Sequence, residues 1–106
     1  MKKGDSVELK MQKILCSGGK IDTNSYHCIV SCYNKKEECI YLVLQSNELN
    51  KLSLDAVYKC EVQTAGANIN CTGRIKERYC GKEGNILKFH IKNGFYKINI
   101  KSLTNK

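Results

Sequence analysis

Apolar and polar residues alternate along most of the chain, and this pattern predicts β-strands almost throughout. Val7, Leu9 and Met11 alternate with polar residues, which is the period of a strand with one buried face. Segment 26–32 is apolar on both faces, as is typical of a strand inside a sheet. The run CIYLVL at 39–44 is rich in β-branched and aromatic residues and predicts a further strand.

The second half of the chain continues the same pattern. Strands are predicted at about 57–63, 69–80, 86–92 and 95–103, with turns rich in Gly and Asn between them. The segment SNELNKL, 46–52, allows one helical turn capped by Ser46 or Asn47, too short to influence the architecture. The chain has 106 residues and no proline, which predicts a single domain over residues 1–106.

These features predict an all-β fold of six to seven antiparallel strands, either a sandwich or a small barrel. A closed barrel is favoured because closure hides the strand edges that a chain without proline would otherwise expose.

Two turns set the expected register of the last three strands. Asn93-Gly94 predicts a two-residue type I′ turn. That turn pairs Ile91 with Tyr96, Phe89 with Ile98 and Leu87 with Ile100.

The segment GKEGN at 81–85 predicts a three-residue loop with Gly84 in a left-handed conformation. It pairs Tyr79 with Leu87 and Ile75 with Ile91. Glu77 then falls opposite Phe89, which indicates a rim position or a nearby β-bulge.

The outer face of this predicted three-stranded meander is basic, in a chain with a formal net charge of +8. The predicted register sets Arg78 opposite Lys88 and Arg74 opposite Lys92. Like charges directly opposite each other destabilise a sheet by roughly some tenths of a kcal/mol for each pair. Nine side chains are predicted on this face, none of them acidic, and Asn99 is the one that cannot carry a positive charge. The eight basic positions are the candidate anion-binding residues Arg74, Lys76, Arg78, Lys88, His90, Lys92, Lys97 and Lys101.

Such a face suits an anionic partner: a nucleotide, a nucleic acid or an acidic protein surface. The alternative is a solvated face in a lysine-rich chain. Two observations favour that alternative. Arginine, which binds phosphate in a bidentate manner, occurs only twice on this face, and Phe95 is the one aromatic residue near it for base stacking.

The chain has seven cysteines. The count is odd and no export signal precedes them, so reduced thiols in a cytoplasmic protein are expected. No Cys-x-x-Cys pair occurs, so neither a zinc site nor any other cofactor is predicted, and the cysteines fit the role of small buried hydrophobes. Cys80 is predicted to share a face with Arg78, and a redox-sensing thiol there stays open.

Catalytic and membrane-spanning features are missing from the sequence. It contains none of the common nucleotide, hydrolase or metalloprotease motifs, and His27 and His90 are the only histidines to serve a cysteine nucleophile. We therefore expect no enzymatic activity. The longest apolar run, CIYLVL, has six residues, against roughly twenty needed to span a bilayer.

Several segments together resemble the N-terminal β-barrel domain of bacterial flagellar-brake proteins, the domain that precedes a PilZ domain. They are KGDSVELKM, the strand with Tyr26-His27-Cys28, LSLDAVYKCEV and GRIKERYCGKEGNILKFHI. The resemblance implies a split β-barrel in cyclic di-GMP signalling that assists a PilZ domain. Arg74-x-x-x-Arg78 matches the first half of the PilZ signature, but it lies in a predicted strand and no Asn-x-Ser-x-x-Gly follows.

The expected function is therefore a non-catalytic regulatory or binding module with a basic sheet face. The alternative is a nucleic-acid-binding barrel of the OB or Sm kind. A structural or oligomer-forming protein is the third possibility, and an uncovered edge of the strand CIYLVL would favour it.

Overall fold

The strands of this protein follow the alternating segments of its sequence. The computed structural model describes the backbone of residues 1–98 and the side chains of residues 1–93. Within these residues one 3-10 turn, η1 (Leu49–Lys51), lies between the strands. The strands are β1 (Ser6–Ile14), β2 (Ser25–Asn34), β3 (Cys39–Leu44), β4 (Ala56–Gln63), β5 (Asn68–Gly81) and β6 (Gly84–Ile98).

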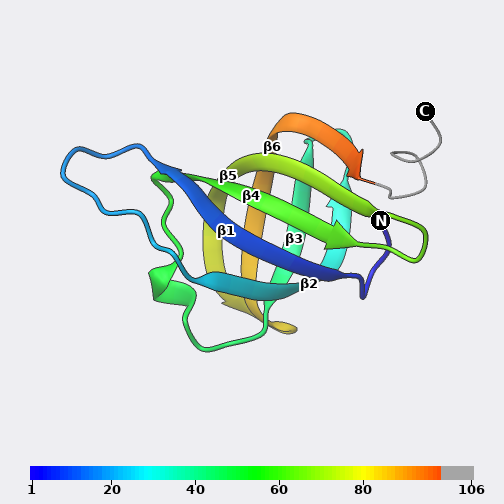
Figure 1. The fold of residues 1–106 in the computed structure, drawn as a ribbon. Coiled ribbons are helices and arrows are strands. Elements are labelled where there is room, and N and C mark those ends of the chain that lie inside the picture. Colours follow the sequence, from blue (N-terminus) through cyan, green and yellow to red (C-terminus); the bar gives the residue numbers. More distant parts are fainter. Residues whose placement is uncertain (99–106) are drawn as a thin grey trace.

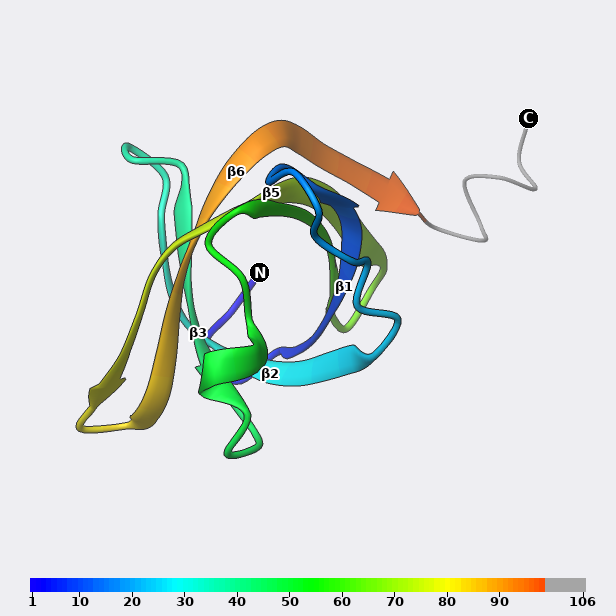
Figure 2. The same cartoon turned by 90° about the vertical axis from the view of Figure 1, so that its left-hand side faces the viewer.

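The six strands close into an antiparallel barrel in the order β1-β2-β3-β6-β5-β4 (Figure 1). Two consecutive meanders, β1–β2–β3 and β4–β5–β6, are joined where β1 pairs with β4 and β3 pairs with β6. Figure 2 looks along the barrel and shows the ring of strands. The predicted all-β barrel is confirmed.

The strand β3 has the bounds of the run CIYLVL. It pairs with β2 on one side and with β6 on the other. Both edges of β3 are therefore covered, and the uncovered edge that would favour an oligomer-forming protein is not found there.

One face of each strand fills the barrel, as the period of two predicts. The largest fully buried side chains include Tyr58 and Phe89, and β1 contributes Val7 and Leu9. Closed packing of this kind leaves the outer face of each strand for polar residues and for a site.

The segment between β3 and β4, residues 45–55, crosses one end of the barrel, and we call it the strap. Leu52 of the strap is fully buried in the core. The Ser53 amide donates a hydrogen bond of 2.9 Å to the hydroxyl of Tyr58. The predicted helical turn is η1, but its N-cap is Glu48 instead of Ser46 or Asn47. Because Leu52 closes the barrel, the strap matters more to the architecture than its sequence indicates.

The β5–β6 turn differs by one residue from its prediction. Gly81 pairs with Gly84, which leaves a two-residue loop, and Tyr79 therefore lies opposite Ile86 instead of Leu87. Gly84 has a φ of +122°, so the glycine requirement at that position is confirmed. The indicated bulge is also confirmed, because the register shifts between Ile75 and Glu77.

The predicted turn at Asn93-Gly94 is wrong. Both residues lie inside β6, which arches over the barrel and continues to Ile98 (Figure 1). The physical reason is the length of β5. Its first half pairs with β4, and it needs the last residues of β6 on its other edge, as in the pairing of Thr72 with Asn93. Folding β6 back on itself would leave that edge unpaired.

Candidate anion-binding site

The β5 bulge separates the two arginines that the sequence places on one face. Arg74 lies before the bulge and opposite His90, whereas Arg78 lies after it and opposite Leu87, which is fully buried. A single extra residue reverses which face the following side chains occupy. The prediction that Arg78 shares the outer face with Arg74 is therefore wrong.

Arg78 holds the strap. Its Nη1 donates to the backbone carbonyls of Asn50, at 3.0 Å, and of Leu52. A longer contact of 3.4 Å reaches the carbonyl of Leu49. These carbonyls occupy the guanidinium, so Arg78 serves the fold at the barrel end.

Lys88 is compensated by acidic neighbours. It lies opposite Glu77, not Arg78, and its Nζ is 4.0 Å from the Glu77 carboxylate and 3.9 Å from that of Glu37. Its Nζ also lies 5.9 Å from the centre of the Tyr41 ring. Tyr41 and then, more weakly, Glu37 and Glu77 raise the pKa of Lys88. The predicted like-charge pairing at Lys88 is wrong, because this lysine lies beside two carboxylates instead of opposite Arg78.

Four of the predicted residues do come together. Arg74, Lys76, His90 and Lys92 line a concavity of about 550 Å³. The strap residues Leu54 and Asp55 and the strand residue Ile75 complete its lining. We call this concavity the basic site.

Contacts within the basic site leave two lysines free. Arg74 Nη2 donates to the carbonyl of Leu54 at 2.8 Å and lies 3.9 Å from the Asp55 carboxylate, which fixes the guanidinium. No carboxylate of the described residues lies within 4.0 Å of the ammonium of Lys76 or Lys92. The site thus combines one oriented guanidinium with two unpaired cations, an arrangement that suits a phosphate group.

The remaining predicted residues lie elsewhere or are not described. Lys97 is near the end of β6, opposite Ile69 of β5, and not on a strand that returns beside Lys88. Asn99 and Lys101 lie outside the described residues.

The cysteines divide by burial. All seven are free. Burial raises the pKa of Cys28 to about 12, and a hydrogen bond with Cys71, together with burial, raises the pKa of Cys60. Among the described residues, no group of three or more His, Cys, Asp and Glu is arranged to hold a metal ion. Cys80 is exposed and lies on the same face as Arg78.

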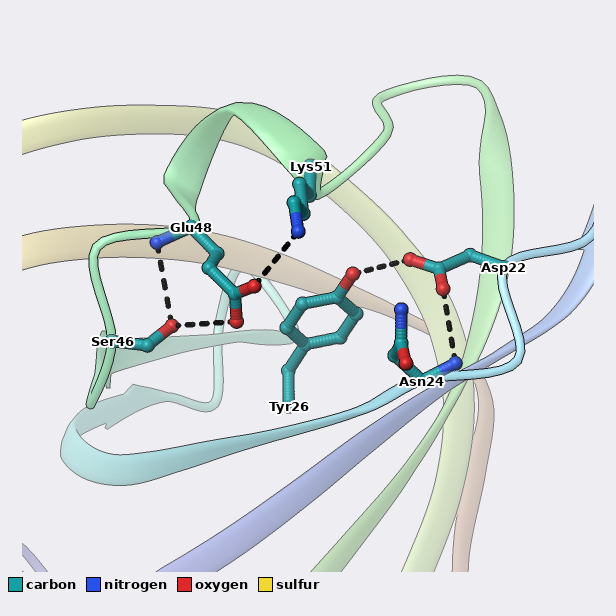
Figure 3. Close-up of polar contacts among 6 residues, drawn as sticks. All are labelled: Asp22, Asn24, Tyr26, Ser46, Glu48 and Lys51. Atoms are coloured by element: carbon teal, nitrogen blue, oxygen red, sulfur yellow. Dashed lines mark hydrogen bonds and ion pairs between the residues drawn. The ribbon is translucent and has the colours of Figure 1, made fainter.

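Sequence reasoning missed a polar cluster between the loop 15–24 and the strap (Figure 3). The Tyr26 hydroxyl donates to the Asp22 carboxylate, which lowers the pKa of Asp22. Burial and then Asp22 raise the pKa of Tyr26 to about 12. On the strap, Lys51 Nζ lies 2.9 Å from Glu48. The carboxylates are thus engaged within the fold, and no motif in the sequence signals this cluster.

Comparison with known proteins finds no matching family model, no similar curated protein and no similar solved structure. No helix of the described residues is both long enough and apolar enough to cross a membrane.

Proposed function

We propose that this protein is a non-catalytic binding module that takes a phosphate-bearing anion in the basic site. The observation that carries the proposal is the convergence of Arg74, Lys76, His90 and Lys92 on one concavity. Among the described residues, no carboxylate lies within 4.0 Å of the ammonium of either lysine. A volume of about 550 Å³ is within the range of small-ligand sites. Arg74 is already oriented by the strap, so little side-chain entropy is lost when it binds.

The proposed biological setting is regulation in cyclic di-GMP signalling, as the resemblance to flagellar-brake barrels implies. The cytoplasm is the proposed location, because seven free thiols fit a reducing compartment. Cyclic di-GMP is the first ligand to test. The formal net charge of +8 favours nucleic acid as the second candidate, so short oligonucleotides belong in the same test.

The test is calorimetric titration of the full chain with cyclic di-GMP, with inorganic phosphate and with short RNA and DNA, at low and physiological salt. The double variant Lys76→Glu/Lys92→Glu should weaken binding at least tenfold, on the order of 1 kcal/mol for each lost cation contact. The slope of log affinity against log salt should also become shallower.

A matched control is Lys10→Glu/Lys59→Glu. These exposed lysines lie opposite each other on β1 and β4, beside Glu8 and Glu61, and neither lines the basic site. This pair changes the net charge equally and should retain at least half of the affinity. Equal losses in both double variants would mean that only net charge matters, and the proposed site would be wrong.

A further inference from the structure

The barrel end that carries the basic site also carries exposed apolar side chains. Leu15, Ile21 and Leu54 are 44%, 46% and 38% exposed. Leu54 lines the basic site, and the Leu15 amide donates a 2.8 Å hydrogen bond to the carbonyl of Asp55. Ile21 belongs to the same loop 15–24 as Leu15. Figures 1 and 2 show this loop and the strap projecting from the same end of the barrel. We call the three residues the apolar trio.

Two lysines lie close in sequence to Leu15 and Ile21 of the apolar trio. Lys13 is exposed and precedes the loop 15–24, and Lys20 is exposed within it. Like Lys76 and Lys92, they have no carboxylate of the described part of the chain within 4.0 Å.

The acids at this end are already engaged. The Asp22 carboxylate accepts a hydrogen bond from the Tyr26 hydroxyl, and Glu48 forms an ion pair with Lys51 (Figure 3). Asp55 faces Arg74. This end of the barrel is therefore positively charged and apolar at once.

We propose that this end docks on the surface of an anionic lipid bilayer. In this arrangement the apolar trio enters the boundary between headgroups and acyl chains, and Lys13 and Lys20 meet lipid phosphates. One headgroup phosphate occupies the basic site, and this part rests on the proposed function.

Charge and chemistry together select a lipid surface over other partners. A nucleic acid would satisfy the lysines but offers no apolar layer to three aliphatic side chains. A second copy of the chain would bring like charges face to face, which opposes association. An anionic bilayer satisfies both the lysines and the apolar trio.

The test is sedimentation of the full chain with vesicles of phosphatidylcholine, with and without phosphatidylglycerol. Binding is expected to the anionic vesicles and not to the neutral ones. Lys13→Gln/Lys20→Gln should weaken it about thirty-fold, from roughly 1 kcal/mol for each lysine at an anionic surface. The control Lys2→Gln/Lys3→Gln removes the same charge at the amino terminus, at the opposite end of β1 (Figure 1), and should change binding less than threefold.

The apolar contribution is tested with the triple variant Leu15→Ser/Ile21→Ser/Leu54→Ser. It should lose at least tenfold in vesicle binding, because each side chain transfers roughly 40% of its surface from water. Tyr79→Ser is the control, since Tyr79 is 41% exposed but lines a different groove with Ser31 and Gly81. Circular dichroism checks that each variant folds.

The outcomes separate the two proposals. Vesicle binding that survives in the triple variant overturns the lipid proposal, even if dissolved phosphate still needs Lys76 and Lys92. A triple variant that changes the sedimentation of the free protein but not vesicle binding would make the apolar trio a self-association surface, and it would also overturn the proposal. Loss of vesicle binding in the triple variant, with phosphate binding absent in every variant, would support lipid docking and reject the basic site.

Discussion

Replacing Arg78 distinguishes a role in the fold from a role in ligand binding. The sequence predicts that Arg78 is an anion ligand. In the structure its guanidinium donates hydrogen bonds to the carbonyls of Asn50 and Leu52 in the strap. Arg78→Ala should therefore destabilise the protein and leave anion binding unchanged. Lys76→Ala, two residues earlier on the same strand, should do the opposite.

The expected magnitude follows from the contacts. A hydrogen bond from a charged donor contributes about 1.5–3 kcal/mol. Arg78 is in part solvated, so we assign its contacts together the value of one such bond. Arg78→Ala should thus lower the free energy of unfolding by about 1.5–3 kcal/mol and the Tm by on the order of 10 °C. Lys76→Ala should stay within about 0.5 kcal/mol of the wild type.

Urea denaturation followed by circular dichroism measures the free energy of unfolding, and calorimetric titration with phosphate measures binding. If Arg78→Ala loses anion binding while its urea midpoint is unchanged, Arg78 is a ligand residue after all. The bulge would then not turn it toward the strap, and the register of β5 and β6 given above would be wrong.

Three further predictions concern packing and titration. Gly73→Ala would place a Cβ 2.1 Å from the His90 carbonyl oxygen and should lower the free energy of unfolding, measured in urea, by about 2 kcal/mol or more. Gly66→Ala is the control, because a Cβ there meets open space and should change this free energy by no more than about 0.5 kcal/mol. Equal effects of the two substitutions would contradict the close approach of β5 and β6. Burial raises the pKa of Cys28 from 9.0 to about 12, so the folded protein keeps this thiol protonated where the unfolded chain loses the proton. The free energy of unfolding should therefore be highest below pH 9 and fall by up to about 4 kcal/mol between pH 9 and 12. A urea midpoint that does not change with pH in this range would count against the burial of Cys28. A thiol reagent should modify three cysteines in the native protein, Cys16, Cys32 and Cys80, and all seven only after unfolding. Rapid modification of a fourth cysteine in the native protein would contradict the burial of the other four.

Local patterns predicted the fold well because burial on one face fixes both the period and the position of a strand. The run CIYLVL gave the bounds of β3, and the misfit of Glu77 indicated the bulge in β5. The turn at Asn93-Gly94 failed because pairing with the first half of β5 outweighs a local turn preference. That competition depends on contacts distant in sequence, which no local pattern contains.

The basic site could be predicted only in part for the same reason. Lys76, His90 and Lys92 follow from alternation, and the structure brings them together with Arg74. The displacement of Arg78 required the position of the bulge. The contribution of the strap required the path of residues 45–55 across the barrel end, and its sequence shows only one short helical turn.

The central claim is that the basic site binds a phosphate-bearing anion, and a nuclear magnetic resonance titration tests it most directly. Uniformly 15N-labelled protein is titrated with cyclic di-GMP and, separately, with inorganic phosphate. We predict saturable shifts confined to the amides of Leu54, Asp55, Arg74, Lys76, His90 and Lys92, and their loss in Lys76→Glu/Lys92→Glu. Shifts that centre on other strands, or no saturable shifts with either anion, would contradict the claim.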